Sequence, residues 1–374
     1  MISATDTSGT IHGFKKALAH VAEQESVAAT LVFCCDQNGF TPARINPLLR
    51  AAKKPLFGGI FPAVLAGHEK LDQGTLVVGL PVLPRIQLVQ GLSATDRDYE
   101  TLLEQGLARA RTRELLFVLV DGLAQRISAF MASLFHLFGL QHNYIGGGAG
   151  SLSLKQKPCI ISNQGLIQDA AVLAAIPVYS GIGVNHGWQS ISGPYRITQA
   201  SRNIIHTIDW QPAYQVYKHI VDQHATCKMR LDNFFDLAKA YPFGIVKIDG
   251  ERIVRDPIEV AGNQAIRCVG EVPEGSFVDV LKGRPQELVK AAAHARLIAE
   301  SALPAGKGER FCLFMDCVSR VLFLGKRFDQ EIQAVFREGE PLFGACTIGE
   351  IANSGREYLE FFNKTAVVAI IESP

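Results

Sequence analysis

The sequence predicts a mixed α/β (α+β) protein, in which helices pack on β-sheets in two domains. Apolar strand-like runs alternate with helical runs, and several strand-like runs are apolar throughout, as in strands buried on both faces. A unit of strand, helix, glycine-containing turn and strand also occurs three times. With 374 residues, of which 48% are hydrophobic and 20% charged, the chain exceeds one ordinary core, so we expect two domains, residues 1–190 and 191–374.

The repeated unit can be followed directly along the sequence. The first copy runs through ATLVFCCD, ARINPLLRAAK, PLFGGIFPAVLAG and GTLVVGL, the second through LLFVLVDG, a helix, YIGGGAGSLSL and PCIISNQG, and the third through FCLFMDC, DQEIQAVFREG, PLFGACTIGEIAN and TAVVAII. Gly58 and Gly59, Gly146 to Gly148, and Gly344 stand at the same place in the three copies. We expect each group to form a turn between a helix and a strand, with at least one glycine at positive φ.

The densest glycine cluster, HNYIGGGAGSLSL (142–154), raises the alternative of a dinucleotide site. Such a site requires a strand before the glycines and a helix after them, because the anion sits on the free N–H groups of a helix start. Here the helical run RISAFMASLFHLFGL comes first and an extended run follows. Gly146-x-Gly148 also lacks a third glycine, since Ser151 stands at that place. The pattern favours a structural turn.

Between the second and third copies the pattern changes to hairpins and helices. PYRITQAS and NIIHTID predict two strands around a turn at Ser201 to Asn203, and FGIVKIDGERIVRDPIEV predicts a hairpin that turns at Asp249-Gly250. A helix follows the first hairpin, with Asp209 as its N-cap and Pro212 in its first turn. The glycine-rich SGIGVNHGWQSISGPY puts the expected domain boundary near residue 190.

The charge and the cysteines of the chain limit the classes of partner and the cellular compartment that we expect. The net charge of +1 and the lack of Lys/Arg runs predict no nucleic-acid partner. No apolar run reaches membrane-spanning length and the N-terminus lacks a signal-peptide pattern, so we expect no membrane partner and a cytoplasmic location. None of the eight cysteines has the CxxC spacing of a zinc or redox site, and Cys34, Cys35, Cys312 and Cys317 lie in apolar runs, where we expect small hydrophobic side chains.

A series of strings resembles the FIST class of bacterial sensory proteins, which combine an N-terminal and a C-terminal FIST domain. The strings, in order, are LLFVLVDG, YIGGGAGSLSLKQKPCIISNQGLIQDAAVLA, GVNHGW, ITQASRNIIHTIDWQPAYQVY, DCVSR, GEIA and FFNKTAVVAII, and the resemblance extends from about Ala29 to Ile371. It implies intracellular sensing of a small ligand, usually an amino acid. Stand-alone chains also resemble the haem-binding, nitric-oxide-sensing members, which act on a separate histidine kinase. The chain departs from the family at GGIFPAV, where many members carry a cysteine-threonine motif; a similar string stands only later, in GACTIGEIA.

His186, in GVNHGWQ, is the first candidate for ligand contact. It lies beside Trp188 in a glycine-flanked loop near the expected domain junction, where pockets tend to form. The resemblance to haem-binding members makes His186 the candidate ligand of haem iron. The alternative is a loop histidine that hydrogen-bonds the backbone and supports the turn. Both interpretations stay open, because FIST proteins without haem share the HGW string.

The third copy contains a second candidate site. Arg320 follows one strand and Glu350 follows the glycine turn, so both should reach the open end of one sheet. Arg320 could grip a ligand carboxylate while Glu350 and Asn363 take an amino group, and the alternative is a salt bridge between Arg320 and Glu350. On the ligand interpretation, Arg320→Ala should abolish stabilisation by the ligand and leave the fold intact. Tyr195 and Arg196, in GPYRIT, are further candidates for ligand contact.

Catalytic motifs are missing from the sequence. Neither GxSxG nor HExxH nor a P-loop occurs, and Cys346, a conceivable nucleophile near Glu350, has no histidine nearby in sequence to act as its base. We therefore expect a sensor of the FIST class and not an enzyme, with haem as cofactor, nitric oxide as ligand and a histidine kinase as partner. A sensor that binds an amino acid without haem is the alternative, and an uncharacterised enzyme is the third possibility.

Overall fold

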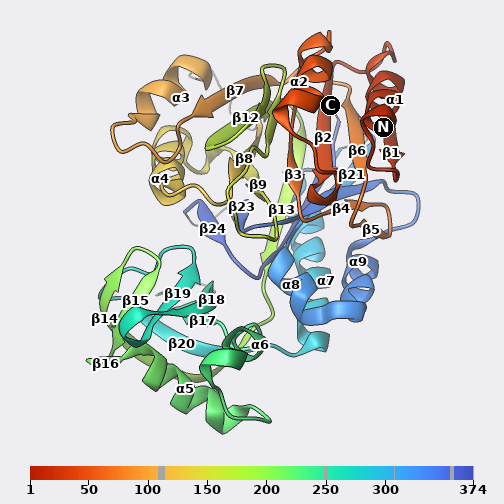
Figure 1. Ribbon diagram of the computed structural model, residues 1–374. Coiled ribbons are helices and arrows are strands. Elements are labelled where there is room, and N and C mark those ends of the chain that lie inside the picture. Colours follow the sequence, from red (N-terminus) through yellow and green to blue (C-terminus); the bar gives the residue numbers. More distant parts are fainter. Residues whose placement is uncertain (108–113, 248–251, 307, 354–357, 374) are drawn as a thin grey trace.

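The computed structural model describes residues 1–107, 114–247, 252–306, 308–353 and 358–373. Helices pack on β-sheets throughout, which confirms the predicted α+β class. Figure 1 shows a large lobe that carries both termini and a smaller lobe below it. The small lobe is formed by the chain between residues 186 and 284, so it is inserted into the large lobe, whose sheets come from the segments before and after it.

The large lobe consists of three copies of one unit, longer than the sequence predicts. Copy one comprises β1 (Ser3–Asp6), α1 (Ile11–Ala22), β2 (Ala29–Cys35), α2 (Pro42–Ala51), β3 (Leu56–Phe61), β4 (Ala63–Ala66), β5 (Glu69–Leu71) and β6 (Thr75–Leu80). Copy two comprises β7 (Arg85–Gln90), α3 (Tyr99–Leu107), β8 (Leu115–Asp121), α4 (Ile127–Phe138), β9 (Asn143–Ala149), β10 (Ile160–Ser162), β11 (Gly165–Ile167) and β12 (Ala170–Ile176). Copy three comprises β13 (Tyr179–Asn185), α7 (Pro285–Ala302), β21 (Arg310–Cys317), α8 (Val318–Leu324), α9 (Phe328–Val335), β22 (Leu342–Thr347), β23 (Glu350–Ala352), β24 (Glu360–Phe362) and β25 (Ala366–Glu372), with the small lobe inserted after β13.

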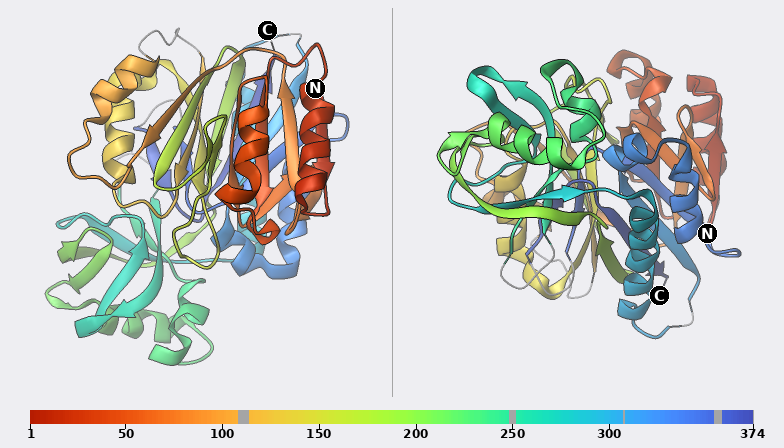
Figure 2. Two further views of the ribbon diagram at one scale, coloured as in Figure 1. Left: turned by 45° about the horizontal axis from the view of Figure 1, so that its top comes forward. Right: turned by 90° about the horizontal axis from the view of Figure 1, so that it is seen from below.

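The three copies exchange strands in a cycle. In each sheet the central strand, β2, β8 or β21, pairs in parallel with the next strand of its own copy and antiparallel with the last one. The hairpin between these two strands leaves its own sheet and completes the edge of another. β10–β11 of copy two joins the sheet of copy one, β23–β24 of copy three joins that of copy two, and β4–β5 of copy one joins that of copy three. Figure 2 shows the resulting arrangement, with the sheets inside and the helices outside.

The repeated glycines lie within strands and not in turns. Gly58, Gly146 and Gly344 belong to β3, β9 and β22, and each stands opposite a residue of the parallel central strand, Val32, Val118 or Phe314. A Cβ atom on these glycines would lie 1.9, 1.7 and 1.8 Å from the carbonyl oxygen of that residue. The predicted turns are therefore wrong, and of these glycines Gly146 alone has a positive φ, 158°. Glycine is required here because the main chains of two strands approach too closely for any side chain.

The small lobe comprises β14 (Gln189–Ser201), β15 (Ile204–Ile208), β16 (Gln211–Pro212), α5 (Ala213–His224), α6 (Phe234–Ala238), β17 (Phe243–Ile245), β18 (Ile253–Ala261), β19 (Ala265–Val269) and β20 (Phe277–Lys282). Its pairings run β14-β20-β17-β18-β19-β15 and return from β15 to β14, so the sheet closes on itself. The predicted β14–β15 and β17–β18 hairpins are confirmed, while the Asp249-Gly250 turn lies outside the described residues. Asp209 is not an N-cap: α5 begins after Pro212, and the Asp209 carboxylate accepts the Arg196 N–H instead.

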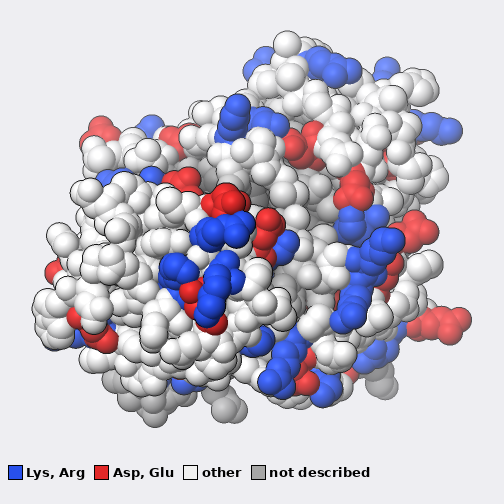
Figure 3. Space-filling model, turned by 60° about the horizontal axis from the view of Figure 1, so that its bottom comes forward, with Lys and Arg blue, Asp and Glu red and all other residues white. Residues whose placement is uncertain are grey.

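The distribution of charged side chains on the surface agrees with the small net charge of the chain. Figure 3 shows acidic and basic side chains interspersed on the face turned to the viewer, without a large area of one sign. None of the described helices is long and apolar enough to cross a membrane. All eight cysteines are free, and all except Cys227 are buried. Their burial agrees with the expected role of small hydrophobic side chains.

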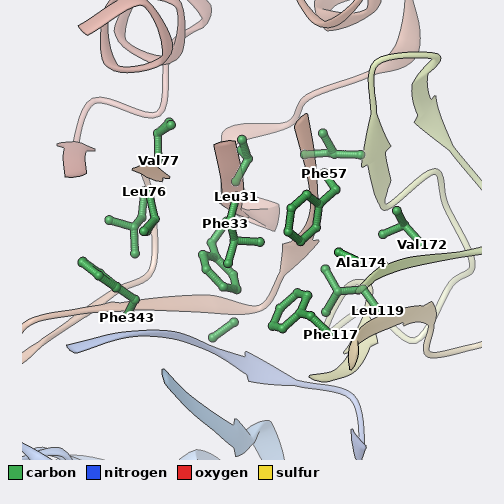
Figure 4. Packing of buried hydrophobic residues seen from close by; sticks show 14 of the residues in the cluster. Leu31, Phe33, Phe57, Leu76, Val77, Phe117, Leu119, Val172, Ala174 and Phe343 are labelled. Atoms are coloured by element: carbon green, nitrogen blue, oxygen red, sulfur yellow. The ribbon is translucent and has the colours of Figure 1, made fainter. Parts of the chain in front are cut away.

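A continuous core joins the three copies. Figure 4 shows Phe33 and Phe57 of copy one beside Phe117 of copy two, with ring centroids 6.4 Å apart for Phe33–Phe117 and 5.8 Å for Phe57–Phe117. Phe343 of copy three belongs to the same cluster. The small lobe has a separate core, in which Tyr217 and Phe243 lie 4.9 Å apart. The three copies of the large lobe thus share a core, and the small lobe has a core of its own.

We expect Gly58→Ala, Gly146→Ala and Gly344→Ala each to lower the free energy of unfolding by more than about 2 kcal/mol, because the new methyl group collides with main chain that cannot move alone. Urea unfolding followed by circular dichroism measures the change. Gly262→Ala is the matched control, since nothing lies within 4 Å of a Cβ atom at Gly262. Equal stability of the four variants would contradict the close-approach explanation.

Candidate functional site

His186 lies where the chain leaves β13 for the small lobe, and it is buried. Its Nδ1 atom accepts the main-chain N–H of Trp188 at 2.9 Å. Burial and the positive charges of Arg320 and Arg252 lower the pKa of His186 to about 4, so the ring is neutral at physiological pH. The backbone contact that the alternative interpretation expected is therefore present, and the imidazole supports the turn that redirects the chain.

Trp188 and Lys364 form the junction between the two lobes. The Trp188 indole N–H donates to the carbonyl of Lys364 at 2.9 Å, and the Lys364 ammonium lies 4.8 Å from the centre of the indole ring. Lys364 is fully buried between β24 and β25 of the large lobe, but its ammonium pairs with Asp256 (3.2 Å) and donates to the carbonyl of Lys239 (2.9 Å), both in the small lobe. The sequence analysis missed this lysine. Its signal was a single cation between two apolar runs, FFN and TAVVAII.

Arg320 is enclosed by protein groups and does not face an open site. Its guanidinium donates to the carbonyls of His186 (2.6 Å), Lys364 (3.1 Å) and Leu288 (3.0 Å) and to Glu331 (2.9 Å from Nε). Burial lowers the pKa of Arg320, but the negative charges of Glu331 and Asp316 outweigh burial, and the net shift is upward. Without this guanidinium, buried carboxylates would lose their counter-ion, which costs about 3–5 kcal/mol. We therefore expect Arg320→Ala to destabilise the fold, in contrast to the expectation from the sequence.

Glu350 and Asn363 are also buried, but the ion-pair partners of Arg320 are Glu331 and Asp316 and not Glu350. The carboxylate of Glu350 accepts the Thr347 hydroxyl at 2.8 Å and the Thr365 N–H at 3.3 Å. Burial raises the pKa of Glu350 to about 8. The Asn363 side chain has no hydrogen-bond partner within the described chain. The proposed Arg320–Glu350 salt bridge is thus absent from the described contacts.

Tyr195 and Arg196 lie on β14 in the small lobe, apart from the other candidates. The Tyr195 hydroxyl is 2.6 Å from the Ser192 hydroxyl, and the exposed Arg196 guanidinium lies 6.0 Å from the centre of the Trp210 ring. The structure therefore brings together His186, Trp188 and Arg320 at the lobe junction. It does not join Tyr195 or Arg196 to them through any recorded contact.

A cleft with a volume of about 620 Å³ lies between the lobes. Its walls come from the start of α4 and the loop before it, from the β14–β15 turn, from the end of β19, and from the crossing hairpin of copy three. The lining residues are Gly122, Leu123, Ala124, Gln125, Ile127, Ser128, Leu154, Gln156, Ser201, Arg202, Asn203, Ile204, Ile258, Arg267, Cys268, Val269, Gly270, Glu271, Ile348 and Phe361. None of the seven residues predicted from sequence borders it.

Comparison of the three copies shows why this position is open. In each copy a connection leads from the central strand to the next helix, at the end of a parallel strand pair, where open α/β sheets bind ligands. In copy one, Asp36 in this connection is covered by Ser151 (2.6 Å) and Lys157 (3.0 Å). In copy three, α8 follows β21 directly, and Arg320 of α8 donates to the carbonyl of His186 at the lobe junction. Of the three positions, only the one in copy two, the connection from Gly122 to Arg126, borders the cleft.

Asp121 supports the wall of the cleft but does not line it. It is buried at the end of β8, and its carboxylate accepts N–H groups of Gln156 (2.8 Å), Asp169 (2.8 Å) and Leu123 (3.1 Å). Burial raises the pKa of Asp121. These bonds hold Gln156 and Leu123 in the cleft wall. The sequence signal for this wall was the string LLFVLVDG, an apolar strand that ends in Asp-Gly before a helix.

Comparison with known families identifies the chain. A model of the FIST N domain matches residues 28–211, and a model of the FIST C domain matches residues 213–353. The chain belongs to the FIST family. FIST domains are associated with signal transduction and small-ligand sensing. No curated protein matches the sequence significantly.

The FIST boundaries divide the molecule differently from its lobes. The small lobe takes β14 to β16 from the matched FIST N segment and β17 to β20 from the FIST C segment, and the cleft is lined by both. The division at residue 190 stays a prediction. The cleft of this FIST protein can form only when both segments are present.

We expect the contribution of Glu350 to the stability of the protein to fall as pH rises from about 5 to about 8, because unfolded Glu350 ionises near 4.5 whereas folded Glu350 keeps its proton until about 8. The expected slope is about 1.4 kcal/mol per pH unit from this group. Glu350→Gln should remove that slope, as measured by urea unfolding at several pH values. Glu338→Gln, which changes an exposed glutamate, is the control. The same slope in Glu350→Gln as in wild type would exclude Glu350 as its source.

Proposed function

We propose that this FIST protein is a small-ligand sensor whose ligand binds in the cleft between the lobes. The observation that carries the proposal is the shared lining: the large lobe supplies the start of α4 and the crossing hairpin, and the small lobe supplies the ends of two strands. A ligand that contacts both walls favours one relative arrangement of the lobes over others. Binding is thereby converted into a change of shape.

Two kinds of contact between the lobes support this mechanism. The junction at Lys364 and Trp188 is buried and serves as a pivot. Contacts around the clefts are more exposed, including Arg202 to Gln125 at 3.3 Å and Lys247 to Glu360 at 2.9 Å. Exposed polar pairs contribute little, typically about 0–1 kcal/mol, so ligand contacts can compete with them. A signalling partner, for which we propose a separate histidine kinase, would read the changed surface.

We propose a small metabolite such as an amino acid as ligand in preference to haem. Haem requires an axial side chain at a site wide enough for the macrocycle. His186 does not border the cleft, and its Nδ1 accepts a main-chain N–H. Cys268 borders it, but the thiol is buried and burial raises its pKa strongly, which disfavours the thiolate. The described residues of this cleft therefore do not fit haem.

We further propose that the protein binds its ligand without transforming it. The described walls of the cleft contain serine hydroxyls but no histidine that could act as their base. Cys346 is fully buried, and burial raises its pKa well above the ordinary value, which makes it a poor nucleophile.

We expect Ser128→Trp to abolish stabilisation by any amino acid that raises the melting temperature of the wild type, because the indole would fill the cleft beside α4. A saturating ligand stabilises by about 2.7 kcal/mol at 100 times its Kd. Thermal unfolding with each proteinogenic amino acid in turn provides the measurement. Ser301→Trp, at an exposed serine near the end of α7, is the matched control and should keep the effect. Undiminished stabilisation of Ser128→Trp would exclude this cleft as the site.

A haemin titration tests the alternative directly. The geometry predicts no stoichiometric Soret band and no shift of such a band with nitric oxide. A sharp band at one equivalent of haemin that disappears in His186→Ala would instead support the haem-based sensor. His142→Ala is the control for that result, because His142 hydrogen-bonds the carbonyl of Phe138 within the large lobe.

A further inference from the structure

We infer that the ligand of the cleft is a small organic anion, a carboxylate or phosphate on an apolar body, and that Arg202 and Arg267 bind its charged group. The inference rests on the proposed function, because it assumes that the cleft is the ligand site. It assigns the specificity of the cleft to two arginines that the sequence analysis did not select.

The two arginines differ from the buried arginines in how they use their donors. Arg320 and Arg255 direct their N–H groups at protein carbonyls and carboxylates inside the molecule. The recorded side-chain contact of Arg202 is a long one, 3.3 Å to the Gln125 amide oxygen. Arg267 donates through Nε to Glu259, whose side chain is 56% exposed. Within the described chain, the terminal nitrogens of Arg267 have no recorded acceptor, so these donors are available to a ligand.

Both arginines project from one edge of the small lobe. Arg202 lies in the turn between β14 and β15, and Arg267 lies on β19, which pairs with β15 so that Ile204 stands opposite Arg267. Both line the cleft, where Glu271 is the one acidic residue of the described lining. Among the charged residues that line this wall, two arginines accompany one glutamate, while Glu259, the partner of Arg267, lies outside the lining. A guanidinium pair can hold a planar carboxylate or a phosphate through several charge-assisted hydrogen bonds.

The opposite wall includes apolar side chains that would contact the body of the ligand. Leu123, Ile348 and Phe361 of the large lobe line the same cleft. Phe361 also borders a neighbouring hollow of about 560 Å³, which Met131 and Phe135 of α4 line. An anion with an apolar body would thus contact the small lobe through its charge and the large lobe through its body. Such a molecule bridges the two parts whose arrangement must change.

Three probes of similar shape test the inference: phenylacetate, phenyl phosphate and the neutral phenylacetamide. Isothermal titration calorimetry and thermal unfolding of the full chain should show that at least one anion binds more tightly than the amide, and the stronger of the two identifies the preferred group. Arg202→Gln and Arg267→Gln should each weaken binding of that anion roughly tenfold, as expected for a lost charge-assisted bond. Arg230→Gln is the matched control, since Arg230 is an exposed arginine of the same lobe that pairs with Asp232. All three variants should unfold at the wild-type temperature without probe.

The outcomes separate this inference from the proposed function. If the amide binds as tightly as the anions, if neither anion binds, or if both arginine variants bind the anions like wild type, the inference is overturned. The Ser128→Trp variant tests independently whether the cleft is the ligand site. In a further outcome, Ser128→Trp abolishes ligand binding while the arginine variants leave it unchanged. That result would support the cleft as the ligand site and exclude an anionic ligand held by Arg202 and Arg267.

Discussion

The exchange of hairpins among the three copies is the constraint on which the structure depends. Each sheet is completed by a hairpin from another copy, and each central strand pair meets at a glycine with no room for a side chain. This exchange carries Ile348 and Phe361 of copy three to the sheet of copy two, beside the connection from β8 to α4. The large-lobe wall of the cleft thus combines residues of copies two and three.

A group of buried charges attaches the small lobe to this core. Arg320 binds the carbonyl of His186, where the chain leaves for the small lobe, and that of Leu288, soon after the chain returns. Lys364 reaches across to Asp256. Burying charges is costly unless every one is paired, so such a cluster tolerates few alternative arrangements. We interpret it as the fixed point about which the lobes are oriented.

The cleft and the junction have different roles in a sensor. At the junction Arg320 and Lys364 are buried and paired with protein groups, whereas Arg202 and Arg267 line the cleft and each contacts an exposed side chain. A ligand can change the balance only where contacts differ between the two arrangements. That condition is met at the cleft, where both lobes contribute walls, and not at the junction.

The sequence by itself determined the local elements of this protein. Alternating apolar runs predicted helices on sheets, the three aligned glycine positions revealed the repeat, and the β14–β15 hairpin followed from its turn residues, because periodicity and turn chemistry act between near neighbours. Only the tertiary structure decided what those residues do. The glycines serve close strand contacts and not turns, Arg320 pairs with Glu331 and not Glu350, and the cleft gathers residues from Gly122 to Phe361. The partner of a charge and the lining of a cleft depend on which distant segments meet, and in this protein the crossing hairpins and the inserted lobe determine that meeting.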